Sequence, residues 1–199
     1  LYREVAQLDP QAPWHWEWLA AAYITLGRSE AALEPLEKSL AILDGALRSA
    51  RSRLLQGMAY SQLDEHASAL KSFDAAIRLN PKLAAAYTNR GASYNALGQY
   101  QRAIQDLDEA IKLNPETAMA YNNRGNSYGN LDQIERAIED YGEALRLDHR
   151  FALAYSNRAL AYTYIGRDEE ARADVERGIE FGLDPGPLLA KIEGAKDVR

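Results

Sequence analysis

The sequence predicts an all-α solenoid, in which short helix pairs stack one after another along the chain. The first observation is that tyrosine, alanine and glycine recur every 34 residues. The second is that each period holds two helical patterns separated by residues that break a helix. One such pair cannot bury its own apolar face, so neighbouring pairs must stack. The recurring residues include Tyr60, Tyr94, Tyr128 and Tyr162, Ala69, Ala103, Ala137 and Ala171, and Gly57, Gly91 and Gly125.

The period that begins at residue 84 shows the helices most clearly. It predicts one helix over 84–97, ended by Gly98 in a left-handed conformation, and a second over 100–113. Asn114–Pro115 ends the second helix because proline disfavours helix in the residue before it. Two other periods have Asp64 and Asp132 at the turn glycine, which aspartate tolerates better than most residues. An earlier period is three residues longer, and we place the extra residues near 44–49.

The segment 86–115, AYTNRGASYNALGQYQRAIQDLDEAIKLNP, resembles a tetratricopeptide repeat. The signature of that family is an aromatic residue, then Gly and Tyr, followed by Ala, Ala and Pro. The resemblance covers nearly the whole chain and implies a right-handed superhelical solenoid of antiparallel helix pairs. Because the first repeat is partial and the chain begins at Leu1, we expect the sequence to be a fragment. The predicted segments of this one solenoid domain are the second helix of a truncated repeat at 1–12, full repeats at 13–49, 50–83, 84–117, 118–151 and 152–183, and a capping helix at 184–199.

The composition excludes several classes of protein. The chain has 47% hydrophobic and 26% charged residues, with a net charge of −6. With no dense stripe of Lys and Arg, that charge argues against nucleic acid as a partner. No apolar run approaches the roughly 18 residues that a membrane helix needs, so we expect no membrane insertion. The absence of cysteine fits a reducing compartment, and we expect a cytoplasmic location. An upstream targeting segment remains open because the chain begins at Leu1.

A recurring arginine and a recurring aspartate are expected to form an ion pair between the two helices of a repeat. The aspartate always follows the arginine by 16 residues, and both are replaced together, by Gln56 and Ser72, in the 50–83 repeat. An exposed pair of this kind contributes about 1 kcal/mol or less. We expect the acidic residues of the second helices to lie on solvated outer faces. The predicted pairs are Arg90–Asp106, Arg124–Asp140 and Arg158–Asp174.

Asparagines recur in the predicted first helices, although each costs a helix up to about 0.7 kcal/mol relative to alanine. One set steps by 34 residues and would form a line across the repeats. Another set lies at i, i+4 and i+8 and therefore on one face of a single helix. The first set is Asn89, Asn123 and Asn157, the second is Asn122, Asn126 and Asn130, and Asn95 of another first helix adds to the line.

The family resemblance gives these asparagines a role, because the first helices of such repeats line a concave groove. Some members of the family hold a peptide with groove asparagines. An amide offers both a donor and an acceptor to a peptide backbone, at about 0.5–1.5 kcal/mol net per bond. If they bind a ligand, replacing Asn123 and Asn157 with alanine should leave stability equal or higher. The alternative is that they are solvated polar sites, with Asn130 serving only to end its helix. The residues assigned to the groove are Asn89, Asn122, Asn123, Asn126 and Asn157.

Apolar residues replace the asparagines near the N-terminus. In the segment WHWEW, Trp14 and Trp18 lie on one helix face, and Trp16 takes the place of the core aromatic. Leu54 and Met58 form a second i, i+4 pair. We expect Trp14, Trp18, Leu54 and Met58 to form an apolar end of the groove, which takes an apolar side chain of the ligand. The alternative is that Trp14 and Trp18 both pack on the truncated upstream repeat.

At the other end of the array, Leu160 and Tyr164 either close the groove or pack on the capping helix. The carboxylate clamp of the family, made by lysine, asparagine and arginine on three consecutive first helices, is missing. No lysine falls in a predicted first helix, and the one pair with matching spacing, Asn122 and Asn126, lacks the charge. We therefore do not expect the C-terminal tail of a chaperone as the ligand.

The sequence shows no catalytic constellation. His15, His66 and His149 are far apart in the repeat frame, and there is no zinc-protease motif, phosphate loop or nucleophile elbow. We expect no catalytic residue, no metal and no cofactor.

Three hypotheses follow for the function. The first is a non-catalytic scaffold that binds an extended peptide segment of a partner protein in its groove. The second is a structural module that forms a homo-oligomer, through Trp14 and Trp18 or the N-terminal helix. The third is a repeat region that serves a larger enzyme or a secretion or assembly protein.

Overall fold

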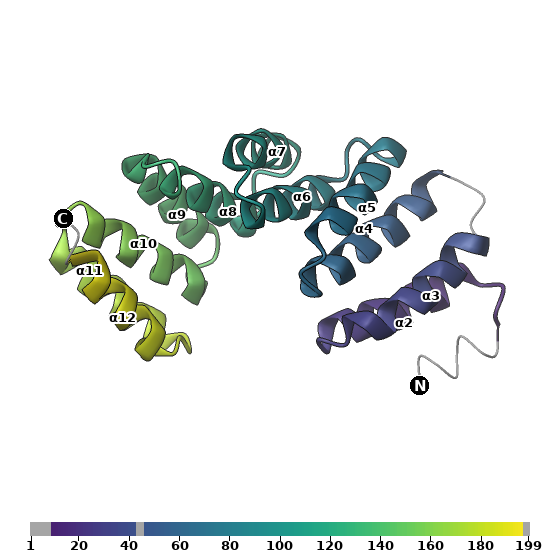
Figure 1. Ribbon diagram of the computed structural model, residues 1–199, viewed down its shortest axis with the longest axis horizontal. Helices are drawn as coiled ribbons and strands as arrows, with labels where there is room; N and C mark the ends of the chain where they lie inside the picture. The colour runs from purple at the N-terminus through teal and green to yellow at the C-terminus, as the bar shows by residue number, and fades with distance from the viewer. Residues whose placement is uncertain (1–8, 43–45, 197–199) are drawn as a thin grey trace. The chain divides into compact units, whose positions relative to one another are not determined.

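The computed structural model describes residues 9–42 and 46–196, where all regular structure is helical (Figure 1). The chain divides into two compact units, Leu1–Gly98 and Gln99–Arg199, which are described in turn. Most of the predicted helix within 1–12, and residues 44 and 45 of the expected insertion at 44–49, lie outside the described residues. Within each unit the helices form antiparallel pairs, as the sequence predicts.

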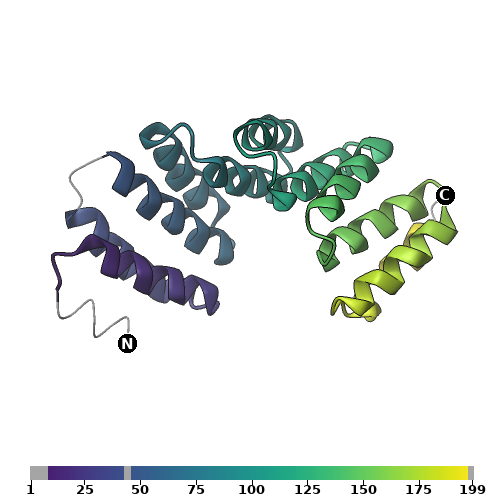
Figure 2. The same ribbon diagram turned by 180° about the vertical axis from the view of Figure 1, so that it is seen from behind.

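The N-terminal unit contains five described helices, which can be followed from both sides in Figures 1 and 2. Each helix contacts the next, and α4 also contacts α2 and α6, so the first helices of successive repeats lie side by side. The helix α4 is longer than α6 by four residues at its N-terminal end, next to the place expected for the extra residues. The helices are α2 (Pro13–Thr25), α3 (Ser29–Ile42), α4 (Ala46–Gln62), α5 (His66–Leu79) and α6 (Ala84–Ala96).

The C-terminal unit repeats this arrangement. The first helices α8 and α10 contact each other, and α12 packs on α10 and α11. The apolar side of α12, formed by Leu188 and Ile192, covers Ala159 and Val175. The helices are α7 (Tyr100–Leu113), α8 (Ala118–Gly129), α9 (Ile134–Leu147), α10 (Ala152–Tyr164), α11 (Asp168–Glu180) and α12 (Pro185–Lys196).

The predicted turn residues adopt the expected backbone conformation. Gly98 has a φ of 69°, and Asp64 and Asp132 have φ values of 59° and 57°. Asparagine, aspartate and glycine are the residues that enter this region at least cost. The predictions that Gly98 ends α6 and that the two aspartates replace a turn glycine are therefore confirmed.

A glycine on the first helix lets an aromatic ring of the second helix approach closely. A Cβ atom at Gly57 would lie 2.4 Å from Phe73 Cε1, and one at Gly125 would lie 2.6 Å from Tyr141 Cε1. The last repeat has Ala159 and Val175 in the same two places, both buried in one apolar cluster. The glycine and the ring are therefore exchanged as a pair, for alanine and the smaller valine.

Two of the predicted ion pairs lie within the C-terminal unit and are confirmed. Arg124 donates from Nε and Nη2 to Asp140 at 2.9 and 2.7 Å, and Arg158 binds Asp174 in the same way. The prediction of a solvated outer face is wrong for Asp106 and Asp140, which are 7% and 6% exposed. The bonds to Arg124 let the carboxylate of Asp140 be buried. The pair Arg90–Asp106 would join the two units and stays a prediction.

The arginine also binds the preceding second helix, which the sequence analysis did not anticipate. Arg124 donates from Nη1 to Asp108 at 2.6 Å, and Arg90 donates to Asp74 at the same distance. Hydrogen bonds to two carboxylates raise the pKa of Arg124 above its ordinary value. For Arg158, the position equivalent to Asp108 is Gly142, which has no side-chain carboxylate. Arg124 thus links neighbouring repeats as well as the two helices of its own repeat.

No helix among the described residues is both long enough and apolar enough to span a membrane.

Candidate functional site

An open pocket of about 560 Å³ lies in the C-terminal unit, where three of the singled-out asparagines meet. It is formed by the C-terminal end of α8, the turn that follows it, the helix α9 and the inner side of α10. The residues that line it are Asn126, Gly129, Asn130, Asp132, Ile134, Tyr141, Asn157, Leu160, Ala161 and Tyr164.

A hydrogen bond between two asparagines joins the first helices α8 and α10. Asn157 donates from Nδ2 to Oδ1 of Asn122 at 3.0 Å, and Asn122 is only 4% exposed. The buried side chain of Asn122 therefore holds the side chain of Asn157 in place. Asn122 itself is not accessible to a ligand at the surface. The bond fixes the amide of Asn157 so that its Oδ1 is left without a partner among the described residues.

This bond changes what is expected of an alanine at Asn157. If Asn157 only binds a ligand, its replacement should leave stability equal or higher. In the structure, Asn157→Ala would leave the buried Oδ1 of Asn122 without a donor, which costs about 1–2 kcal/mol. We therefore expect a loss of stability from that substitution, whether or not Asn157 binds a ligand.

The amide of Asn126 is fixed by a tyrosine of the partner helix α9. Tyr141 donates its hydroxyl to Oδ1 of Asn126 at 2.8 Å. Burial raises the pKa of the Tyr141 phenol, so the hydroxyl stays neutral and remains a donor at physiological pH. The NH₂ group of Asn126 is then left for the pocket, without a partner among the described residues.

The polar rim of the pocket is made by the turn after α8. Asn130 ends this helix, and its Nδ2 donates to the backbone oxygen of Asn126 at 2.8 Å. Its Oδ1 has no partner among the described residues. Asp132, exposed in the left-handed turn position, adds a carboxylate to the lining. The helix-ending role that the sequence suggested for Asn130 is thus present together with a place in the pocket.

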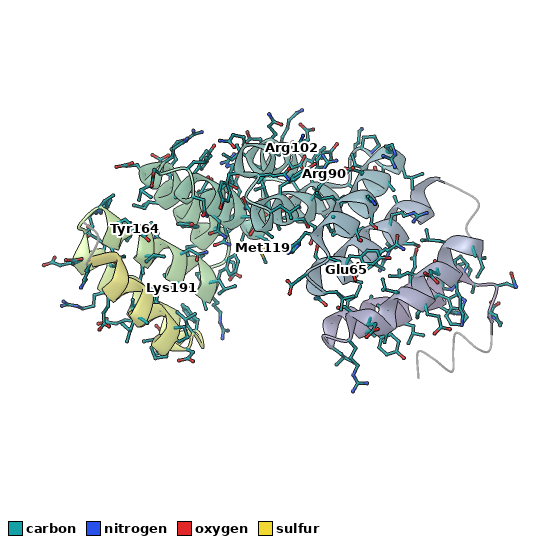
Figure 3. All side chains as sticks on the ribbon, in the orientation of Figure 1. Glu65, Arg90, Arg102, Met119, Tyr164 and Lys191 are labelled. Atoms are coloured by element: carbon teal, nitrogen blue, oxygen red, sulfur yellow. The ribbon has the colours of Figure 1, made fainter. Side chains whose placement is uncertain are left out.

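Apolar side chains form the remaining walls. Ile134 comes from the start of α9, and Leu160 and Ala161 come from α10. Leu160 also packs against the cluster that the capping helix covers, as one of the two alternatives expected. Its role in closing the groove stays a prediction. Tyr164, labelled in Figure 3, is the last residue of α10 and is 49% exposed at the edge of the pocket.

The other predicted asparagines lie outside this pocket. Asn123 is half-buried on α8, and its backbone oxygen accepts a bond from Ser127. Asn89 lies on α6 in the N-terminal unit and donates from Nδ2 to the oxygen of Ala85 at 2.8 Å. A line of asparagines across the two units stays a prediction.

Two of the apolar residues predicted for the groove, Trp18 and Leu54, line different cavities. Trp14 and Trp18 are 42% and 46% exposed on α2, with His15 between their rings. Trp18 lines a shallow cavity of about 440 Å³ made by α2 alone. Leu54 lines a separate cavity of about 310 Å³, and Met58 packs against the apolar core.

The third tryptophan of the same helix is the core aromatic that the sequence predicts. Trp16 is buried and donates from Nε1 to the oxygen of Pro10 at 3.0 Å. It packs with Leu19, Tyr23 and Ile42.

A buried polar cluster in the N-terminal unit was not anticipated. Glu17 is 7% exposed and accepts a hydrogen bond from Ser52 at 2.6 Å, with Arg51 Nε 3.6 Å from its other oxygen. Ser39 lies 3.1 Å from Ser52. In the repeat frame Glu17 takes the place of Asn122, so both residues mark a position where a buried polar group contacts the next first helix.

The sequence analysis missed the part that Tyr141 plays. Its place is held by Phe73, Leu107 and Val175 in the other repeats. A hydroxyl added at an otherwise apolar core position needs a hydrogen-bond partner. In the sequence, that single tyrosine therefore indicates a polar group on the facing helix, and Asn126 is that group.

These features define a class of protein: an array of helix pairs whose candidate site is a surface pocket lined by amides, rings and aliphatic side chains. A model described as tetratricopeptide repeat matches 84–117 and 118–151, and a second with the same description matches 50–83. Together they match 50–151, which is 102 of the 199 residues. The chain therefore belongs to the tetratricopeptide repeat family. Such repeats are non-catalytic scaffolds for protein–protein interaction, and the matches indicate no enzyme family.

Solved structures with the same fold include other tetratricopeptide repeat proteins. TTC0263, a thermophilic protein of Thermus thermophilus, is 23% identical, with a TM-score of 0.76 over 92% of this chain and 98% of that one. MamA is 26% identical, with a TM-score of 0.67 over 81% and 93%. YrrB, described as a TPR protein with an unusual peptide-binding site, is 19% identical, with a TM-score of 0.68 over 100% and 98%. No curated protein matches the chain.

Proposed function

We propose that the chain binds an extended segment of a partner protein in the pocket between α8, α9 and α10. The observation that carries this proposal is the pair of fixed amides on neighbouring first helices. Asn126 offers a donor because Tyr141 occupies its oxygen, and Asn157 offers an acceptor because Asn122 occupies its NH₂. One pocket therefore offers both groups that a peptide backbone requires.

The two internal hydrogen bonds also favour binding energetically. A side chain that is already held in one conformation loses less entropy when it binds a ligand. Each bond to a peptide contributes about 0.5–1.5 kcal/mol net, and the walls formed by Ile134 and Leu160 add apolar contact. An extended peptide still loses much entropy on ordering, so we expect dissociation constants on the order of micromolar.

Other properties of the chain agree with a peptide rather than with other ligands. The net charge of −6 opposes nucleic acid, and no lysine lies on a first helix to bind a terminal carboxylate. No cluster of His, Asp and Glu suited to a metal ion exists among the described residues. The structural neighbour YrrB is itself described as having a peptide-binding site. A cytoplasmic location stays an expectation.

The test uses substitutions that other repeats of this chain already contain. Ala92 and Phe73 hold the places of Asn126 and Tyr141 in neighbouring repeats. The double variant Asn126→Ala, Tyr141→Phe removes the amide without leaving a buried hydroxyl unpaired. Peptides selected on the full chain from a randomised display library are then titrated by calorimetry. We expect at least tenfold weaker binding to the double variant and an unchanged melting temperature.

The single substitution Asn95→Ala is the matched control, because it removes an asparagine of a first helix in the N-terminal unit. It should leave the affinity unchanged. The proposal is wrong if no peptide is selected, or if the selected peptides bind the wild type and the double variant equally.

A second candidate function is self-association, favoured by the exposure of Trp14 and Trp18 on α2. Aromatic side chains are enriched at protein interfaces. Light scattering at several concentrations would show a mass that rises in the wild type and not in the Trp14→Ser, Trp18→Ser variant. A constant monomer mass in both proteins excludes this candidate.

A further inference from the structure

The net negative charge of the chain lies entirely in the unit that contains the pocket. Residues 1–98 contain ten Lys and Arg and ten Asp and Glu, whereas residues 99–199 contain 13 and 19. The whole net charge of −6 therefore belongs to the C-terminal unit. A unit with this charge attracts a cationic ligand and repels an anionic one.

The pocket itself presents more acceptors than donors. Asn157 and Asn130 each use their NH₂ group internally, which leaves their Oδ1 atoms. Asp132 adds a carboxylate. The donors that remain are the NH₂ of Asn126, the hydroxyl of Tyr164 and the second N–H of the Asn157 and Asn130 amides, fewer than the lone pairs of the free oxygens. Since a lysine or arginine side chain carries only donors, it matches the acceptors that remain.

No lysine or arginine of the described chain supplies that cation. None lines the pocket. Arg158, next to Asn157 in the sequence, is bound to Asp174. Arg136, two residues after Ile134, is also held elsewhere. It donates to Gln133 and Tyr128, and its guanidinium carbon lies 3.9 Å from the centre of the Tyr128 ring.

The apolar walls suit the aliphatic part of such a side chain. Ile134, Leu160 and Ala161 can cover the methylene groups of a lysine or arginine, while the charged end reaches the polar rim. The exposed ring of Tyr164 offers a face to the cation. A purely apolar side chain would instead remove water from Asn130, Asn157 and Asp132 without replacing the hydrogen bonds.

We propose that the partner segment places a lysine or arginine side chain in this pocket, with its charged end at Asp132 and the amide oxygen of Asn130. The inference rests on the proposed function, because it names the side chain that accompanies the peptide backbone. The asparagines bind the backbone of the partner peptide whatever its sequence. The acceptors at the rim of the pocket select a lysine or arginine side chain.

The experiment compares three acetylated and amidated nonapeptides that differ only at the central residue, which is lysine, norleucine or glutamate. Dissociation constants come from titrations of the ¹⁵N-labelled full chain at 50 mM salt. We expect the lysine peptide to bind about fivefold tighter than the norleucine peptide, and the glutamate peptide to bind weakest. At 500 mM salt the advantage of lysine should shrink, because salt screens an exposed charge pair.

Two matched variants locate the effect. Asp132→Asn removes the charge and keeps a residue that adopts the left-handed turn, so the lysine advantage should fall below about twofold. Asp64→Asn makes the same change at the same turn position of the N-terminal unit and should keep the full advantage.

The outcomes separate the two proposals. If norleucine binds as tightly as lysine and shifts the same pocket resonances, the inference is wrong and the proposed function stands. A lysine advantage that survives Asp132→Asn also overturns the inference, because the cation then binds elsewhere. If none of the peptides shifts the resonances of α8 and α10, the proposed function itself fails.

Discussion

The repeats at 50–83 and 118–151 share a packing design and differ along one helix face. Both place a glycine against a ring, Gly57 with Phe73 and Gly125 with Tyr141, and both turn at an aspartate with positive φ. Yet Met58 packs in the apolar core, whereas Asn126, in the corresponding place, lines a pocket. Positions packed between the two helices of a repeat therefore determine the fold. The neighbouring positions on the first helix can instead carry polar residues and line a pocket.

The largest expected effect breaks the shared part of the two repeats. Gly57→Ala and Gly125→Ala each bring a methyl group well inside contact distance of a buried ring. We expect each to lower the free energy of unfolding by about 2–3 kcal/mol, measured by chemical denaturation.

The last repeat, with Ala159 and Val175, provides the control for this prediction. Adding Tyr141→Val to Gly125→Ala should give a double variant that is less destabilised than the sum of the two single changes. Simple additivity would mean that the ring is not what the methyl group meets.

The next effect concerns the ion pair that 118–151 has and 50–83 lacks. Arg124→Gln removes the charge that pairs with the buried Asp140, and we expect a loss of about 2–3 kcal/mol. In the 50–83 repeat, Ser72 donates to Gln56 at 3.3 Å in the same two places. Arg124→Gln with Asp140→Ser should therefore recover more than half of the loss in denaturation experiments. A double variant less stable than the single one would contradict this account of the pair.

A smaller effect tests the support behind the pocket. Asn157→Ala should cost about 1–2 kcal/mol because it leaves the buried Asn122 oxygen unpaired. Thr88 holds the place of Asn122 one repeat earlier and satisfies its own hydroxyl, by a bond to the oxygen of Ala84. Adding Asn122→Thr should thus return most of the lost stability, as read from the melting temperature. If Asn157→Ala alone is neutral, the amide–amide bond is unimportant for folding.

The smallest effect sharpens the comparison at the turn. Asp64→Gly and Asp132→Gly replace residues with positive φ by the residue that adopts it most easily, so each should stabilise the chain by about 0.5–1 kcal/mol. The two melting temperatures should rise equally. Peptide titration should then show that only Asp132→Gly lowers the preference for lysine. Unequal stabilisation would mean that one of the aspartates makes a contact beyond its turn.

Sequence periodicity predicted the helix pairs because helix-breaking residues and recurring small residues determine where helices end and pack within a few residues of sequence. The turn at Asp132 and the pair Arg124–Asp140 were predictable from one repeat compared with the next. The burial of Asn122 was not, since i, i+4 spacing groups Asn122 with Asn126 but does not tell how the helix is rotated against its neighbour. The second carboxylate on Arg124, from Asp108, likewise depends on how consecutive repeats stack.

The most direct test of the pocket is to follow the asparagine side-chain NH₂ signals in ¹⁵N spectra while a selected peptide is added. The NH₂ of Asn126 has no partner among the described residues, whereas that of Asn157 is bonded to Asn122. We predict a downfield shift and slower exchange for Asn126, with little change in the NH₂ of Asn157. A peptide that binds at full strength without moving the Asn126 signal would contradict the proposed site.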